Sequence, residues 1–132
     1  MSLAWPSQSD PPFAVPPAII HVIDLPRPPS VNRIWRNHHR SAGYMAWIEQ
    51  ADALIMAHGG LRGREMIRGH FTALIEIKPT SIRCDLDNRI KAVLDYAQRI
   101  ALISNDQNCM EITAKWSEEA IAGCRLTIRS IG

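Results

Sequence analysis

Hydrophobic and polar side chains alternate most regularly in the segment HFTALIEIK, residues 70–78. An extended chain points successive side chains to opposite faces, so this alternation is typical of a strand that buries one face. The segment ends at Pro79, which cannot donate a hydrogen bond to a sheet. We therefore predict a strand over 70–78 whose buried positions are Phe71, Ala73, Ile75 and Ile77.

Two other segments have helical spacing. Apolar residues recur every three or four positions over 44–58, where Gly59–Gly60 end the pattern, and again over 87–101. Trp47 is expected in the core or in a dimer interface. The apolar positions of the first helix are Met45, Ile48, Ala51 or Asp52, Ile55 and Met56. The buried stripe expected on the second helix is Ile90, Leu94, Ala97 and Ala101.

Short segments rich in branched side chains predict three more strands, over 18–25, 109–116 and 123–131. Only SEEAIA separates the last two, so we expect them to form a hairpin. The element order is then β-α-β-α-β-β. This order predicts a small single α/β (α+β) domain with a mixed sheet of about four strands and two helices.

Composition sets the limits of the domain. Five of the nine prolines lie within residues 1–17, which we expect to form a flexible arm before a domain over 18–132. No apolar run approaches the roughly 20 residues that span a bilayer, and the first residues do not resemble a secretory signal. The three cysteines are odd in number and show no CxxC spacing. We expect a cytoplasmic protein with reduced thiols and no membrane association.

The segment RCDLDNRIKAVLD, residues 83–95, places two acids close together where the second helix begins. In an extended chain Asp85 and Asp87 point to the same side, where like charges repel unless a cation lies between them. Lys91 follows Asp87 by one helical turn. Asp106 comes in the turn after the helix, and the sequence leaves open whether the chain returns far enough for it to join this cluster.

Carboxylate oxygens suit Mg²⁺, with Mn²⁺ as a possible substitute, and such a site would attract a phosphodiester once metal is bound. Lys91 would then hold a phosphate oxygen or stabilise charge that develops in the transition state. The structural alternative is that Asp87 is a helix N-cap, that Asp87 and Lys91 form an ordinary i,i+4 pair, and that Asp106 is a turn residue.

Three stretches, taken in order, resemble the RusA family of Holliday-junction resolvases. DLDNRIKAVLD is similar to that family's D-x-D-N-x-x-K signature, which opens a helix, and LPRPPSVNRIWR resembles its N-terminal L-P-x-P-P-S-x-N-R stretch. ISNDQN falls where the family carries its third catalytic aspartate. Asn105 departs from the acid that many relatives carry there, and Ala101–Leu102 replace the usual glycine after the helix.

The resemblance implies a homodimeric endonuclease that cuts four-way DNA junctions with Mg²⁺. Asp85, Asp87 and Asp106 would bind the metal, and Lys91 would be the essential lysine. Two alternatives remain, a branched-DNA-binding module that does not cleave and a related nuclease that acts on other branched DNA.

Basic side chains near these motifs are candidates for DNA binding, although a solvated loop explains those after residue 26 equally well. The formal charge of +2 neither demands nor excludes nucleic acid. The residues that we expect to contact DNA are Asn32, Arg33, Arg36, Arg40, Arg83 and Arg89.

Overall fold

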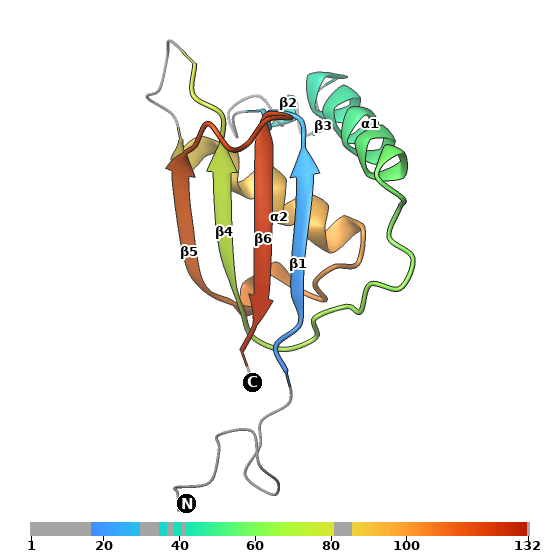
Figure 1. Ribbon diagram of the computed structural model, residues 1–132. Coiled ribbons are helices and arrows are strands. Elements are labelled where there is room, and N and C mark those ends of the chain that lie inside the picture. The colour runs from blue at the N-terminus through green and yellow to red at the C-terminus, as the bar shows by residue number, and fades with distance from the viewer. Residues whose placement is uncertain (1–16, 30–34, 37–38, 41, 81–85, 132) are drawn as a thin grey trace, which may run out of the picture.

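The computed structural model describes residues 17–29, 35–36, 39–40, 42–80 and 86–131, and it confirms the predicted fold class. A four-stranded mixed sheet is the centre of the domain (Figure 1). Its strands, in spatial order, are β1 (Ile20–Leu25), β6 (Cys124–Ser130), β4 (Phe71–Ile77) and β5 (Cys109–Trp116). β6 is antiparallel to both of its neighbours, whereas β5 is parallel to β4. Residues 1–16, most of the predicted arm, lie outside the described residues.

The predicted hairpin between residues 109–116 and 123–131 is wrong. β4 lies between β5 and β6, so these two strands do not pair with each other. Strand β4, helix α2 (Ile90–Arg99) and strand β5 form a crossover unit, and a crossover returns the chain parallel to the strand from which it started. The connection after β5 then passes the end of β4, where the Ser117 N–H donates a 2.9 Å hydrogen bond to the Ile77 carbonyl.

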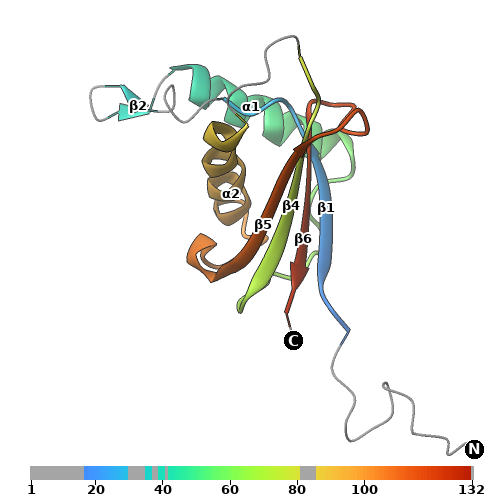
Figure 2. The ribbon, with the colours of Figure 1, turned by 90° about the vertical axis from the view of Figure 1, so that its left-hand side faces the viewer.

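Both helices lie on the same face of the sheet (Figure 2). Helix α1 (Ala42–Ala57) contacts β1, and a 3₁₀ turn, η2 (Asp87–Arg89), leads into α2. On α2 the predicted burial of Leu94 and Ala97 is confirmed, but Ala101 is exposed because it follows the helix in another conformation. The buried residues of α2 are Ala92, Val93, Leu94, Tyr96 and Ala97.

The buried face of α1 differs from the predicted one at its two methionines. Met45 and Met56 are 41% and 73% exposed, and aromatic residues fill the core in their place. Trp47 is buried, as predicted for a core residue, and its Nε1–H donates a 3.0 Å hydrogen bond to the Pro26 carbonyl. The buried residues of α1 are Tyr44, Trp47, Ile48, Ala51 and Ile55.

The two helices end in the same way, but with different residues. After α1, Gly59 has a φ of 98°, which is the left-handed conformation that glycine adopts without strain. After α2, Ala101 takes this role with a φ of 63°. The Leu102 N–H then donates a 3.0 Å hydrogen bond back to the Ala97 carbonyl, which closes the α2 terminus. The alanine noted in the sequence therefore occupies a position that favours glycine.

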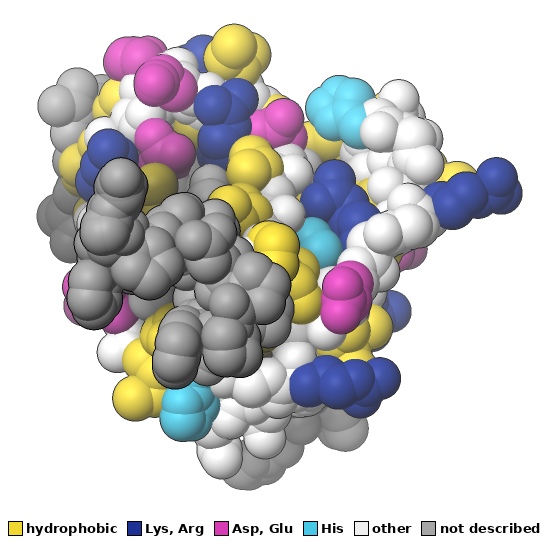
Figure 3. All heavy atoms as spheres, turned by 60° about the horizontal axis from the view of Figure 1, so that its bottom comes forward, with side chains coloured by type: hydrophobic (Ala, Val, Ile, Leu, Met, Phe, Trp, Pro, Cys, Tyr) yellow, Lys and Arg dark blue, Asp and Glu magenta, His cyan; other side chains and the backbone are white. Residues whose placement is uncertain are grey.

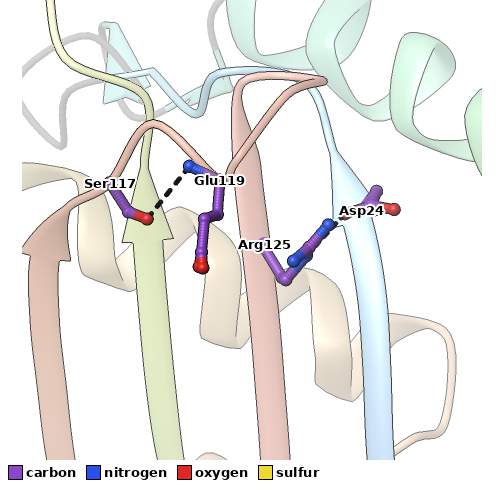
Figure 4. Close-up of polar contacts among 4 residues, drawn as sticks. All are labelled: Asp24, Ser117, Glu119 and Arg125. Atoms are coloured by element: carbon purple, nitrogen blue, oxygen red, sulfur yellow. Dashed lines mark hydrogen bonds and ion pairs between the residues drawn. The ribbon is translucent and has the colours of Figure 1, made fainter.

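The face of the sheet opposite the helices carries a row of alternating charges across all four strands. In register, Asp24 on β1 lies beside Arg125 on β6, Arg125 beside Glu76 on β4, and Glu76 beside Lys115 on β5. The Arg125 Nε lies 3.1 Å from Asp24 Oδ1 (Figure 4). Opposite charges on neighbouring strands stabilise a sheet modestly, so the row helps to fix its register.

The predicted loop over 26–43 contains one short ladder. Strands β2 (Trp35–Arg36) and β3 (His39–Arg40) pair antiparallel within it. Residues 26–29, directly after β1, remain close to the sheet, and Pro28 among them is buried.

Candidate active site

The start of α2 carries the central acid of the candidate site. Asp87 is exposed and lies inside the 3₁₀ turn, so it is not the cap of either segment. The cap positions belong to Leu86 and Arg89, and neither side chain makes a capping hydrogen bond. The structural alternative in which Asp87 serves as the N-cap is therefore wrong, and a solvent-facing carboxylate remains at the head of the helix.

Lys91 lies in the first turn of α2, with its side chain 52% exposed. Its Nζ lies 3.6 Å from Asp95 Oδ2, so its ion pair runs forward along the helix rather than back to Asp87. An exposed i,i+4 pair contributes little stability, about 0.3–0.5 kcal/mol. The ammonium is therefore able to leave Asp95 for a phosphate at small cost.

Arg89 connects the head of α2 to the segment that follows β1. Its Nη1 donates a hydrogen bond to the Pro28 carbonyl. The same segment also contacts the connection before β6, since a Cβ on Gly123 would come within 2.5 Å of the Arg27 nitrogen. The proline-rich stretch LPRPP and the acid-bearing helix therefore meet at one end of the sheet, although they are about 60 residues apart in sequence.

Asp106 opens a second 3₁₀ turn, η3 (Asp106–Asn108), directly before β5. It is half-buried, and its backbone N–H donates a 2.9 Å hydrogen bond to Gln98 Oε1 in the last turn of α2. Asn105 caps the turn by accepting a hydrogen bond from the Gln107 N–H. Nothing in the hydrophobic pattern indicates Gln98, so sequence reasoning missed the residue that holds Asp106 against the helix.

Asp87 and Asp106 lie at opposite ends of α2. In a parallel β-α-β unit the residues before the helix follow the end of the first strand, and the residues after it precede the start of the second. Figure 2 shows this arrangement, with η3 at the opposite end of the sheet from the head of α2. The ten residues of α2 alone span roughly 15 Å. Within a single chain, therefore, Asp106 does not reach Asp87.

The remaining predicted site residues fall largely outside the described part of the chain. This holds for Asp85, which would be the nearest acid to Asp87, and for the side chains of the DNA-binding candidates Asn32, Arg33, Arg36, Arg40 and Arg83. Among the residues that the structure does describe, no three His, Cys, Asp or Glu side chains gather as they would to hold a metal ion. Asp87 supplies a hard oxygen donor of the type that Mg²⁺ uses, and Mg²⁺ needs only one or two carboxylates beside water and phosphate.

The surroundings of Asp106 are mixed in charge. Burial raises the pKa of the neighbouring Cys109 thiol above its usual value, and the charge of Asp106 adds to that shift. Figure 3 brings this end of the sheet forward, and on its visible described surface basic and acidic side chains are interspersed. The Asp106 end of a single chain therefore does not form one continuous basic surface in this view.

No protein-family model matches the chain, and no curated protein matches it significantly. In the described segments, no helix has the length and apolar character needed to cross a membrane.

Proposed function

We propose that the chain is a metal-dependent endodeoxyribonuclease that resolves Holliday junctions by paired symmetric phosphodiester cleavage. The observation that carries this proposal is the meeting of two motifs at one end of the sheet. The proline-rich stretch after β1 contacts the head of α2, where Asp87 is exposed without being a cap and Lys91 lies one turn further on. This convergence supports a shared site for the two most specific parts of the resemblance to the RusA family.

In this proposal each residue has a defined task. Asp85 and Asp87 would bind Mg²⁺, which, when bound, supplies charge stabilisation and a water of lowered pKa. Lys91 would exchange its half-buried partner Asp95 for a phosphate oxygen and neutralise charge on the leaving side of the phosphodiester. Arg89, which is anchored on the Pro28 carbonyl, would hold the proline-rich stretch in place beside the DNA backbone.

In this proposal Asp106 contributes to the active site only in a homodimer. Because Asp106 lies at the far end of α2 in its own chain, it can complete an Asp85–Asp87 site only in a second subunit. A four-way junction has two equivalent strands to cut, and a dimer with two-fold symmetry presents two identical sites.

The proposal is tested by incubating the purified protein with a synthetic four-way junction and a matched linear duplex, with Mg²⁺ or with EDTA. We expect paired symmetric nicks in the junction alone, and no nicks in EDTA. Asp87→Asn should abolish cleavage and retain junction binding, while Glu49→Gln, which removes an exposed charge from α1, should leave both unchanged. Tight junction binding without metal-dependent cleavage would overturn the proposal and favour the non-cleaving module, for which Asn105 is the one hint. Preferred cleavage of flaps would favour the related nuclease.

A mixing experiment tests the role of Asp106. Asp87→Asn and Asp106→Asn should each be inactive as homodimers, whereas a mixed dimer would contain one site with both native aspartates. We therefore expect mixing to restore single nicks but not paired ones. No recovery in a mixture whose subunits demonstrably exchange would remove Asp106 from a shared site.

A further inference from the structure

The two edges of the sheet differ in how they are protected. At the β1 edge, His21 is buried and its Nε2 lies 2.6 Å from the Glu65 carbonyl oxygen, so the segment after α1 contacts that strand at His21, although Ile20 and Val22 are 50% and 48% exposed. β5 is the opposite edge and pairs only with β4 among the described strands. It is eight residues long, and its apolar side chains Met110 and Ile112 are 59% and 43% exposed. A long edge strand with exposed apolar side chains is a template for pairing with another strand.

We infer that β5 pairs antiparallel with β5 of a second copy of this chain, with Thr113 on the two-fold axis. The surface stands on the geometry of β5 itself, and only its link to Asp106 rests on the proposed function. Two four-stranded sheets would join in this way into one continuous sheet. Strand addition of this type satisfies the outward-facing backbone N–H and C=O groups of both edges.

The charges on β5 select this register. In an antiparallel pair, residues directly opposite each other point to the same face. A two-fold axis through Thr113 places Glu111 opposite Lys115 of the partner, twice by symmetry, and Ile112 opposite Ala114. An axis through Glu111 or Lys115 would place that residue opposite its own like charge, and an axis through Ile112 or Ala114 would place neither charge opposite the other. β5 is therefore self-complementary in only one register.

This register also extends the charge row on the open face of the sheet. Within one chain the row ends at Lys115, whose register neighbour on β4 is Glu76, and Glu76 is only 9% exposed. In the paired sheet the partner's Glu111 would follow Lys115, so that signs continue to alternate across the interface. Lys115 would then lie between two carboxylates, which opposes pairing with any strand that presents a cation at this position.

The pairing has a consequence for the proposed active site. A two-fold axis perpendicular to the sheet keeps both sets of helices on the same face and reverses the strand direction. The start of the partner's β5, with its η3 turn, then lies beside the end of this chain's β5. That is the end at which α2 begins, so the pairing brings the partner's Asp106 toward the Asp87 end of the sheet.

Charge reversal tests the register. Analytical ultracentrifugation of the intact protein should show a dimer. Glu111→Lys should weaken self-association by roughly tenfold or more, because two attractive pairs become repulsive. Lys115→Glu should do the same. An equimolar mixture of the two variants should recover dimers, since each subunit then opposes the other's reversed charge. Glu49→Lys, which makes the same charge change on the exposed face of α1, should not alter association.

Lys115→Glu also places two acids side by side within the chain, at positions 76 and 115, so the test needs a second readout that does not depend on these charges. A cross-link gives that readout. Thr113→Cys should form an intermolecular disulfide under mild oxidation, whereas Thr127→Cys on the central strand should not. A monomeric wild-type protein, or variants that fail to complement while folded by circular dichroism, would overturn the inference. A dimer of this kind that cuts no junction would overturn the proposed function alone. Junction cleavage by a dimer that the charge reversals do not weaken and that Thr113→Cys does not cross-link would overturn the β5 pairing alone.

Discussion

The hydroxyl of Tyr96 donates a 2.6 Å hydrogen bond to Asp52 Oδ1, and this bond joins α2 to α1. The Tyr96 ring is fully buried and packs edge-to-face on Trp47, with 5.4 Å between ring centroids. Helix α2 is thus fixed by a polar and an aromatic contact in its middle, while Asp87, in the η2 turn before it, and Lys91, in its first turn, face solvent. The rigid middle of the helix supports the exposed candidate site at its head.

Tyr96→Phe should lower the free energy of unfolding by about 1 kcal/mol, because it removes one hydrogen bond and retains the ring. Urea denaturation followed by circular dichroism measures the change. Asp52→Asn should cost less, since an amide oxygen still accepts the bond. Equal stability of Tyr96→Phe and the wild type would show that the bond contributes nothing in solution.

Alkaline pH should destabilise the fold. Burial and, second, the Asp52 hydrogen bond raise the pKa of Tyr96 well above its usual value, and burial raises the pKa of the Cys124 thiol to about 12. In the unfolded chain the pKa values of these two groups are about 10 and about 9, so above those pH values the unfolded state binds fewer protons than the folded state. The stability contribution of both groups is complete below about pH 8 and falls as the pH rises further. Denaturation midpoints between pH 8 and 10.5 should therefore decrease, and less steeply in Tyr96→Phe.

Ala101→Gly should stabilise the protein by about 1 kcal/mol. Ala101 holds a φ of 63°, where a Cβ is unfavourable and glycine is not. The thermal midpoint gives the comparison, and Ala97→Gly, inside α2 and fully buried, should be destabilising as the control. A loss of stability in Ala101→Gly would mean that unfolded-chain entropy outweighs the strain.

Gly123→Ala should destabilise the fold by about 2 kcal/mol or more, because it combines backbone strain with overpacking. The φ of Gly123 is 126°, and an added Cβ would lie 2.5 Å from the Arg27 backbone nitrogen. Gly69→Ala is the matched control, since its added Cβ would meet nothing within 4 Å. Chemical denaturation of both variants separates the two cases, and equal effects would contradict the close approach of the two segments.

Lys91→Ala should separate stability from function. The side chain is half exposed and its ion pair with Asp95 is a surface one, so the free energy of unfolding should change by less than about 0.5 kcal/mol. Junction cleavage should nevertheless be lost. Arg99→Ala removes the same charge from the opposite end of α2 and should retain cleavage. Loss of cleavage in both variants would indicate a general charge effect rather than a role for Lys91.

The sequence predicted the elements better than their pairing. Alternation from Phe71 to Ile77 identified β4, because a strand with one helix-covered face must repeat every two residues. The hairpin prediction failed because the short link after Trp116 suggested local pairing, whereas β6 is held by β1 and β4 from distant parts of the chain. No local pattern encodes which distant strand a segment will join.

The failure to predict which strands pair also left the position of Asp106 unpredicted. Once the segments at 70–78 and 109–116 are recognised as the two parallel strands of one crossover, the acids before and after α2 must lie at opposite ends of that helix.

The prediction that Met45 and Met56 belong to the buried face of α1 failed for another reason. Helical spacing alone leaves the position of the buried arc uncertain, and the large rings of Tyr44 and Trp47 bury more apolar area there.

The central position of β6 also governs how fast the domain can fold. β1 has no strand partner other than β6 in the described sheet, and the pair His21 and Ile128 joins residues 107 positions apart. Such long-range contacts require large loops to close before they stabilise anything, which slows folding. During synthesis β1 therefore has no strand to pair with until β6 has been made, and in that interval it is exposed to aggregation.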